Sequence, residues 1–68
     1  MKHVSARDFI RVLQRHGWTL ARTHGSHHIV TKPGRQERLV VPVHRGHDLK
    51  TGMLRHLLKV AGIDESEL

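Results

Sequence analysis

A chain of 68 residues without cysteine allows one domain with a small core, and it excludes disulfides and thiolate zinc sites. No apolar run approaches the roughly 20 residues of a membrane span, and the N-terminus lacks the apolar core of a signal peptide, so we expect a cytoplasmic protein without a membrane partner. Residues 1–62 contain all twelve Lys and Arg and only three acidic residues, which gives them a net charge of +9. The acidic tail lowers the net charge of the chain to +6. Such a basic chain favours nucleic acid or an acidic protein as its partner.

The first predicted element is a helix over residues 5–16. Ser5 is a good N-cap, and Asp8 three residues later resembles the acidic member of a capping box. Apolar residues recur at helical spacing and predict a buried face made of Ala6, Phe9, Ile10 and Leu13. A basic stripe elsewhere on the helix consists of Arg7, Arg11 and Arg15. Gly17 favours the left-handed conformation that ends helices, and Trp18 is the apolar residue expected to fold back after it.

Three short strands are predicted next. The first starts at Trp18 and is broken by the Gly-Ser pair at 25–26. The second starts at His27 and ends at the turn dipeptide of residues 33–34. The third covers residues 38–43, whose proline suits an edge or a strand end. The short links between them favour a three-stranded antiparallel meander.

A second amphipathic helix follows the loop "HRGHDL". We expect it to be capped by Thr51, with Asp48 as the alternative, and to end at Gly62. Residues 64–68 form an acidic tail that we expect to fray. The α-β-β-β-α order predicts a single α+β domain over residues 1–68, in which both helices cover one face of the sheet and leave the other face open. This order and length match the double-stranded RNA-binding domain.

Four stretches carry a more specific resemblance: "HGW" after the first helix, "GSHHIV" at the second strand, "VPVHRGHDLKTGML" before the second helix, and "LLKVAGI" at its end. Over residues 4–63 the chain resembles the HicA toxin family, small mRNA-cleaving ribonucleases of toxin–antitoxin pairs. The resemblance implies an endoribonuclease without metal or cofactor, one essential histidine in the Gly-Ser-His stretch, and inhibition by a HicB antitoxin. The turn "KPGRQER" lacks the family's more usual His-Pro-Asp-Gly run, which we expect to affect the hairpin and not the chemistry.

The chemistry of RNA cleavage explains why histidine is needed. A base takes the proton of the 2′-oxygen and an acid protonates the leaving 5′-oxygen, and imidazole suits both transfers near neutral pH. The family pattern places the catalytic histidine at His27. Strand parity puts His27 on the same face as Ile29, which we expect to be buried, and this keeps His28 as the second choice. His27 can still escape burial because it starts the strand, at its rim. Ser26 is a supporting residue whose hydroxyl hydrogen-bonds the phosphate or orients the imidazole.

The remaining site residues are assigned to RNA binding. We expect phosphate contacts from the residues near the predicted turn and loop, namely Gly25, Lys32, His44, Arg45 and Lys50. His24 lies close to the candidate site and is a minor candidate for assisting it. His44 and His47 are three residues apart, but zinc needs three or four convergent ligands, so we predict no metal site.

The expected partners are messenger RNA and a HicB-like antitoxin. The toxin and the antitoxin can form an oligomeric complex. We expect the antitoxin to be acidic on the surface that covers the histidines. Two alternatives remain open at this stage: a non-catalytic module that binds double-stranded RNA by its shape, and a DNA-binding or scaffolding accessory protein.

Overall fold

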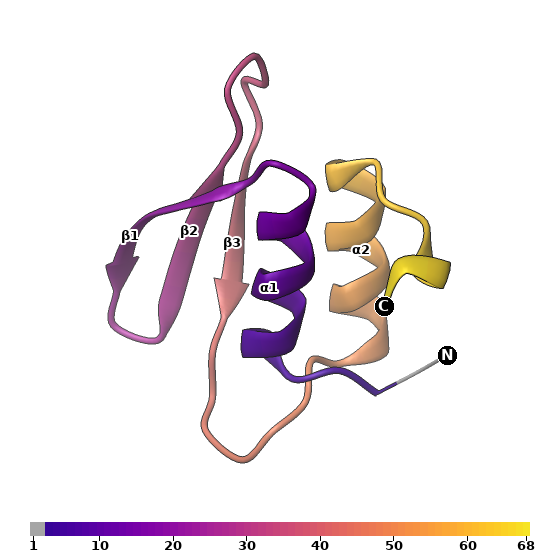
Figure 1. The fold of residues 1–68 in the computed structure, drawn as a ribbon. Helices are drawn as coiled ribbons and strands as arrows, with labels where there is room; N and C mark the ends of the chain where they lie inside the picture. The colour runs from indigo at the N-terminus through magenta and orange to yellow at the C-terminus, as the bar shows by residue number, and fades with distance from the viewer. Residues whose placement is uncertain (1–2) are drawn as a thin grey trace.

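The computed structural model describes residues 3–68, and the element order is the predicted α-β-β-β-α. The elements are α1 (Ala6–Arg15), β1 (Thr19–His24), β2 (His27–Thr31), β3 (Arg38–Pro42), α2 (Thr51–Ala61) and a short 3-10 helix, η1 (Glu65–Glu67). The strands form one antiparallel sheet in the order β1-β2-β3. The two helices lie side by side on the same side of this sheet (Figure 1). The predicted fold class is therefore confirmed.

Helix α1 begins and ends where the sequence predicts. The Ser5 side chain accepts a hydrogen bond from the backbone N–H of Asp8 at 3.1 Å, which is the expected N-cap. The Asp8 carboxylate does not complete a capping box but pairs with Arg11 at 3.1 Å. Gly17 has a φ of 91°, and Trp18 donates its backbone N–H to a carbonyl of the last turn of α1 at 3.0 Å. This stop turns the chain into β1 and buries Trp18.

The start of α2 differs from the prediction. Its N-cap is Lys50, and no side chain caps the helix, so neither Thr51 nor Asp48 has the expected role. Thr51 is already the first helical residue, and Asp48 is held in an isolated bridge to Ser5, which aligns the chain before the helix begins. The helix ends as predicted at Gly62, which is left-handed with a φ of 72°.

Arg35, in the loop between β2 and β3, connects that loop to the far end of α2. Its Nη2 donates to the backbone carbonyl of Val60 in the last turn of the helix. The guanidinium also lies 5.6 Å from the centroid of the Trp18 ring and donates through Nε to Glu37 at 3.0 Å. One side chain thus joins a loop, a helix end and the core.

The two faces of the sheet differ in burial. Val30, Leu39 and Val41 face the helices and are at most 2% exposed. Ile29, which we expected to be buried, is only half-buried, and its partner Val40 on β3 is 42% exposed. That expectation is wrong because both helices pack on the side of Val30, and neighbouring residues of a strand point to opposite faces.

A β-bulge in β1 changes which side chains share a face. Leu20 pairs with Val30, but the next pair is Arg22 with Ile29, so Ala21 is the extra residue. Strict alternation from Leu20 would turn Arg22 and His24 toward the helices. The bulge instead places both on the open face, the side of the sheet that the helices do not cover.

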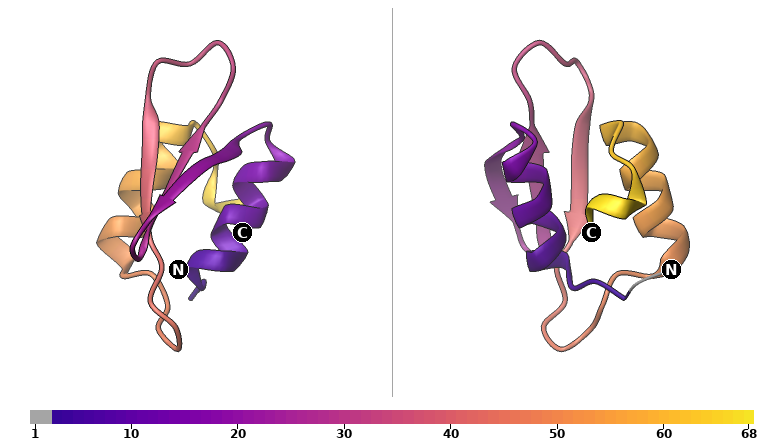
Figure 2. Two further views of the ribbon diagram at one scale, coloured as in Figure 1. Left: turned by 90° about the vertical axis from the view of Figure 1, so that its left-hand side faces the viewer. Right: turned by 45° about the vertical axis from the view of Figure 1, so that its right-hand side comes forward.

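The acidic tail is not frayed as expected. The Asp64 side chain accepts a hydrogen bond from the backbone N–H of Ser66 at 2.9 Å, which starts η1. The Glu67 carboxylate lies 3.1 Å from Nε2 of His16 at the end of α1, and Leu68 packs against the core. Figure 2 shows this segment folding back beside the two helices. The tail is ordered because its acidic and apolar groups find partners on the basic body.

Candidate active site

The β1–β2 turn is held close to the loop that leads into α2. Gly25 occupies the turn with a φ of 61°, a left-handed conformation that glycine adopts readily. The carbonyl of Ser26 accepts a 2.7 Å hydrogen bond from the backbone N–H of Val43, the first residue after β3. Figure 1 shows the β1–β2 turn and the 43–50 loop, which joins β3 to α2, at the same end of the molecule. Residues 25–26 and the 43–50 loop therefore form one continuous rim.

His27 begins β2 at this rim and is exposed. Its cross-strand partners are His24 on β1 and Pro42 on β3. Directly paired residues of antiparallel strands project to the same face, with Cβ atoms about 4.5–5.5 Å apart. The imidazoles of His24 and His27 are therefore neighbours on the open face, and both are exposed.

His28 has a different environment from its neighbour in the chain. It pairs with Thr23 and Val41 on the side of the sheet that faces the helices, and it is half-buried. Its Nδ1 atom is buried and finds no hydrogen-bond partner among the described residues. The two candidate histidines thus differ in access, because strand geometry sends one toward solvent and the other toward the core.

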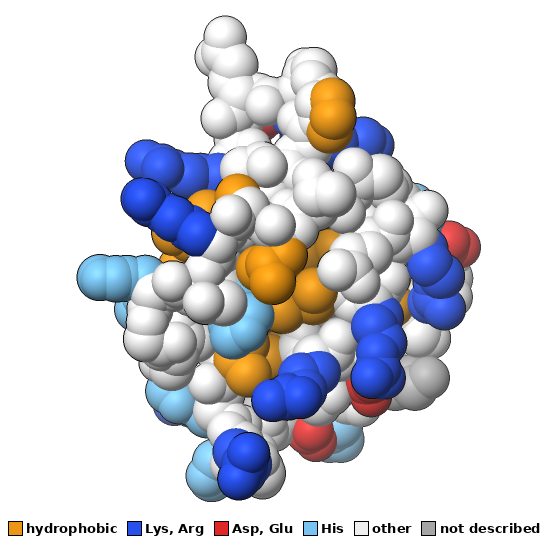
Figure 3. All heavy atoms as spheres, turned by 60° about the vertical axis from the view of Figure 1, so that its left-hand side comes forward, with side chains coloured by type: hydrophobic (Ala, Val, Ile, Leu, Met, Phe, Trp, Pro, Cys, Tyr) orange, Lys and Arg blue, Asp and Glu red, His pale blue; other side chains and the backbone are white. Residues whose placement is uncertain are grey.

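Beside the two exposed histidines the open face is hollowed. An open depression of about 250 Å³ is lined by Arg22, Thr23, His24 and Ile29. Arg22 pairs with Ile29, one row along the sheet from the His24–His27 pair. On the side of the molecule that carries β1, Lys, Arg and His side chains surround a hydrophobic patch (Figure 3). This surface offers positive charge and imidazole groups to an anionic partner.

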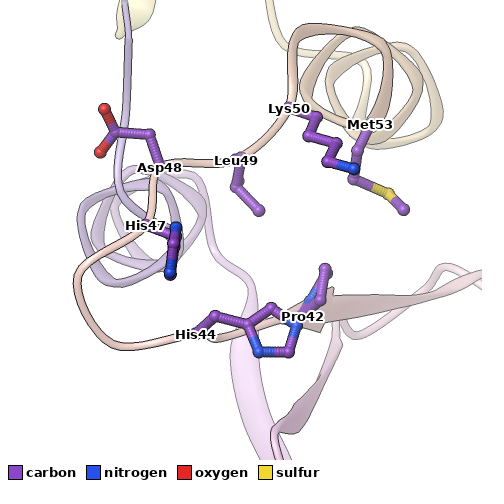
Figure 4. Close-up of a pocket in the computed structure, with 7 residues that line it drawn as sticks. All are labelled: Pro42, His44, His47, Asp48, Leu49, Lys50 and Met53. Atoms are coloured by element: carbon purple, nitrogen blue, oxygen red, sulfur yellow. The ribbon is translucent and has the colours of Figure 1, made fainter.

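A larger pocket lies between the end of β3 and the start of α2. Its volume is about 470 Å³, and its wall includes Pro42, which is the β3 partner of His27. Figure 4 shows the rings of His44 and His47 turned toward this pocket and Lys50 on its α2 side. A second pocket of about 440 Å³ on the other side of the loop is lined by Arg45 and the first residues of α1, among others.

The structure brings most of the predicted RNA-binding residues to this rim. Gly25 lies in the turn, and His44, Arg45 and Lys50 lie in the loop joined to it. Lys32 is the exception. It follows the other end of β2, roughly 16 Å from His27 along the strand, and its side chain leans over Gly17.

Arg22 is the residue that sequence reasoning missed. Nothing in the pattern "WTLARTH" reveals the bulge at Ala21, so alternation alone gives no signal that Arg22 joins the histidines.

No third potential metal ligand joins the two loop histidines among residues 3–68. Although His44 and His47 line one pocket, the Asp48 carboxylate points away from it (Figure 4). Over residues 3–68 there is no group of three or more His, Cys, Asp or Glu side chains that could hold a metal ion. Within the same part of the chain, no helix has the length and apolar character needed to cross a membrane.

The sequence over residues 6–63 matches the family profile described as HicA toxin of bacterial toxin–antitoxin. The chain belongs to the HicA toxin family. The match covers α1, the whole sheet and α2, so every residue of the rim lies within it. A comparison with curated proteins gives no significant match. As a member of the HicA toxin family, the protein is a toxin of a toxin–antitoxin system.

Proposed function

We propose that this toxin is an endoribonuclease that cleaves messenger RNA without a metal ion, using His27 as its proton-transfer group. The observation that carries the proposal is the position of His27: exposed, at the start of β2, and next to a glycine turn in a basic rim. A macromolecular substrate reaches such a group without any rearrangement of the core. Membership of the HicA toxin family supports an RNA-directed toxin.

The proposed reaction needs only the RNA and the side chains of the rim. The 2′-oxygen attacks the adjacent phosphorus while His27 takes its proton, and the bond from phosphorus to the 5′-oxygen breaks. The products are a 2′,3′-cyclic phosphate and a 5′-hydroxyl, whose oxygen receives one proton from the protonated His27 ring or from a second acid at the site. Gly25 lets the phosphate approach the backbone closely, and the Ser26 hydroxyl donates to a phosphate oxygen or orients the imidazole. A positioned proton carrier typically contributes about 10²–10⁴-fold.

Access favours His27 over His28. A ribose in an RNA strand has to reach a ring nitrogen within hydrogen-bond distance. His28 faces the helices, and one of its two ring nitrogens is buried. His28 therefore serves as the matched comparison in the test below.

RNA binding is assigned to the cations of the 43–50 loop. Arg45 and Lys50 are exposed and belong to the loop whose first residue is hydrogen-bonded to Ser26. Lys50 also lines the pocket that includes Pro42, the β3 partner of His27. We expect the double change Arg45→Ala and Lys50→Ala to weaken binding of every RNA sequence similarly and to flatten the salt dependence of log K by about 1 per lost phosphate contact. Binding titrations between 50 and 200 mM salt measure this slope, because affinity that depends on phosphate contacts falls strongly over that range. An unchanged slope would place the RNA elsewhere.

The proposed protein partner is a HicB-like antitoxin. Residues 1–62 carry a charge of +9, so a partner with an acidic surface is attracted to this basic part of the chain. We expect such a partner to cover His27 and to block cleavage sterically. A complex in which both His27 and His28 stay accessible to RNA would contradict this mode of inhibition.

The decisive experiment compares four proteins on one defined messenger RNA, with and without EDTA. They are the wild type, His27→Ala, His28→Ala, and His56→Ala, an exposed histidine of α2 that serves as control. We expect His27→Ala to lose at least about 10²-fold in cleavage rate and to stop arresting growth, with no change from EDTA. Circular dichroism checks that each variant is folded.

Each other outcome has a definite meaning. Loss of cleavage only in His28→Ala would move the catalytic role to that residue. Loss on chelation would require a metal. RNA binding without cleavage by the wild type would make the protein a duplex-binding module instead.

A further inference from the structure

We propose that His24 is the second proton-transfer group of this site, the general acid that protonates the leaving 5′-oxygen. This inference rests on the proposed ribonuclease function and adds to it the residue that completes the reaction. A single histidine has to carry a proton across the phosphate during one cleavage. Two histidines on either side of the phosphate avoid that transfer.

The pairing of the strands places the two rings together. His24 and His27 are direct cross-strand partners that close the two-residue turn. Their Cβ atoms are therefore about 4.5–5.5 Å apart on one face, so that two rings that splay apart can reach the same phosphate from different sides. Both residues are exposed. Neither side chain has a hydrogen bond or ion pair among the described residues, so both rings are available to a ligand.

The surroundings of the pair suit a phosphate. The bulge at Ala21 puts Arg22 on the same face, and Arg22 and His24 line one depression with Ile29. The strand positions of the open face carry no Asp or Glu; they are Thr19, Arg22, His24, His27, Ile29, Thr31, Arg38, Val40 and Pro42. A guanidinium one row from two imidazoles stabilises the extra negative charge of the phosphorane.

The proton balance of the step is complete. The neutral ring of His27 takes the proton from the 2′-hydroxyl as its oxygen bonds to phosphorus. The protonated ring of His24 gives its proton to the 5′-oxygen as the bond from phosphorus to that oxygen breaks. One ring gains a proton and the other loses one, so exchange with water restores both for the next cycle. Neither an oxidant nor a metal takes part.

Other histidines are placed less well for this role. His28 projects to the opposite face. His44 lies beyond Pro42 in the 43–50 loop, with its ring turned toward the pocket beside α2 (Figure 4). His44 is therefore the competing candidate that the test has to include.

A substrate with a sulfur in place of the bridging 5′-oxygen tests the assignment. A thiolate leaves without a proton, so such a substrate does not need the acid. A short oligonucleotide with this linkage at a mapped cleavage site of a messenger RNA is compared with its oxygen counterpart. The proteins are the wild type, His24→Ala, His24→Gln, His27→Ala, His44→Ala and the control His56→Ala.

We expect both His24 variants to lose about 10²-fold or more on the oxygen substrate and to cleave the sulfur substrate within a few-fold of the wild type. His27→Ala should be slow on both substrates. In the pH profile of kcat/KM, the wild type should show a bell shape, and the His24 variants should lose the descending limb at alkaline pH. The sulfur rescue distinguishes an acid from a merely structural residue.

Three results would overturn the proposal. His24 variants as fast as the wild type on the oxygen substrate would exclude any role, while leaving the ribonuclease function intact. Equal loss on both substrates would make His24 structural, and rescue of His44→Ala instead would assign the acid to the loop. A wild type that cleaves no RNA at all would contradict the ribonuclease function itself.

Discussion

The two faces of β2 are made by neighbouring residues and serve different ends. On the side of the helices, Val30 is fully buried and His28 is half-buried with an unpartnered Nδ1. On the open side, His27 is exposed and Ile29 is only partly covered. Burial stabilises the fold on one face, and access permits chemistry on the other. Because successive side chains of β2 point to opposite faces, the residues that stabilise this toxin are separate from those of its proposed activity.

The largest effect that tests this separation is a pair of truncations on β3. Leu39→Ala removes a side chain that is 2% exposed and should cost about 2–5 kcal/mol of unfolding free energy, since a cavity remains. Val40→Ala, on the neighbouring residue of the open face, should cost well under half of that, because Val40 is 42% exposed. Urea denaturation measures both. Equal losses would mean that the open face is as well packed as the core.

A smaller effect concerns the helix that covers the buried face. Ser5→Ala removes the side-chain oxygen that accepts from the Asp8 N–H, and it should cost about 1 kcal/mol. Ser5→Asp keeps an acceptor and should retain most of the stability. Thermal unfolding compares the two. If Ser5→Ala melts at the same temperature as the wild type, the N-cap contributes nothing to stability, and α1 is held on the sheet by its packing alone.

A still smaller effect concerns His28. Leucine at this position removes a buried nitrogen that has no partner, so His28→Leu should leave the stability unchanged or raise it by a few tenths of a kcal/mol. RNA cleavage should stay near the wild-type rate. A melting temperature lowered by more than about 4–8 °C, which corresponds to 1 kcal/mol in a domain of this size, would show that the imidazole contributes to the fold.

The smallest effect lies at acidic pH and involves two exposed carboxylates outside the sheet. A backbone N–H and the Arg35 guanidinium lower the pKa of Glu37, and hydrogen bonds from Ser66 lower the pKa of Asp64. A lowered pKa adds stability above the ordinary values of 4.5 and 3.8, and this stability is lost as the pH falls through the lowered values. The double variant Glu37→Gln and Asp64→Asn should therefore show a weaker fall of melting temperature below about pH 4.5. A slope identical to the wild type would rule out both contributions.

The main elements of the fold could be predicted because local signals agree along the chain. Ser5 and Gly17 bound α1, Gly62 ends α2, and the turn at 25–26 separates the first two strands, each for a reason that operates within a few residues. The start of α2 could not be predicted in the same way. Lys50 became its N-cap because a bridge to a distant residue positions the preceding chain.

For the candidate site, the sequence supplies the candidate residues and leaves their geometry open. The Gly-Ser-His stretch points to His27, and the 43–50 loop is identifiable by its basic and histidine residues. The expectation that Ile29 is buried is wrong, since a run of apolar β-branched residues does not reveal which neighbour the helices cover. Arg22 was missed because a bulge leaves no trace in a short strand sequence.

The sequence by itself determined the order of the elements, the basic charge of the body and membership of the HicA toxin family, because these depend on residue types and their local spacing. Only the tertiary structure decided which face of β2 is buried, that the bulge turns Arg22 and His24 toward His27, and that the tail docks against His16. These depend on where the helices pack and on which strands pair. Both are contacts between residues far apart in the chain, and no local pattern records them.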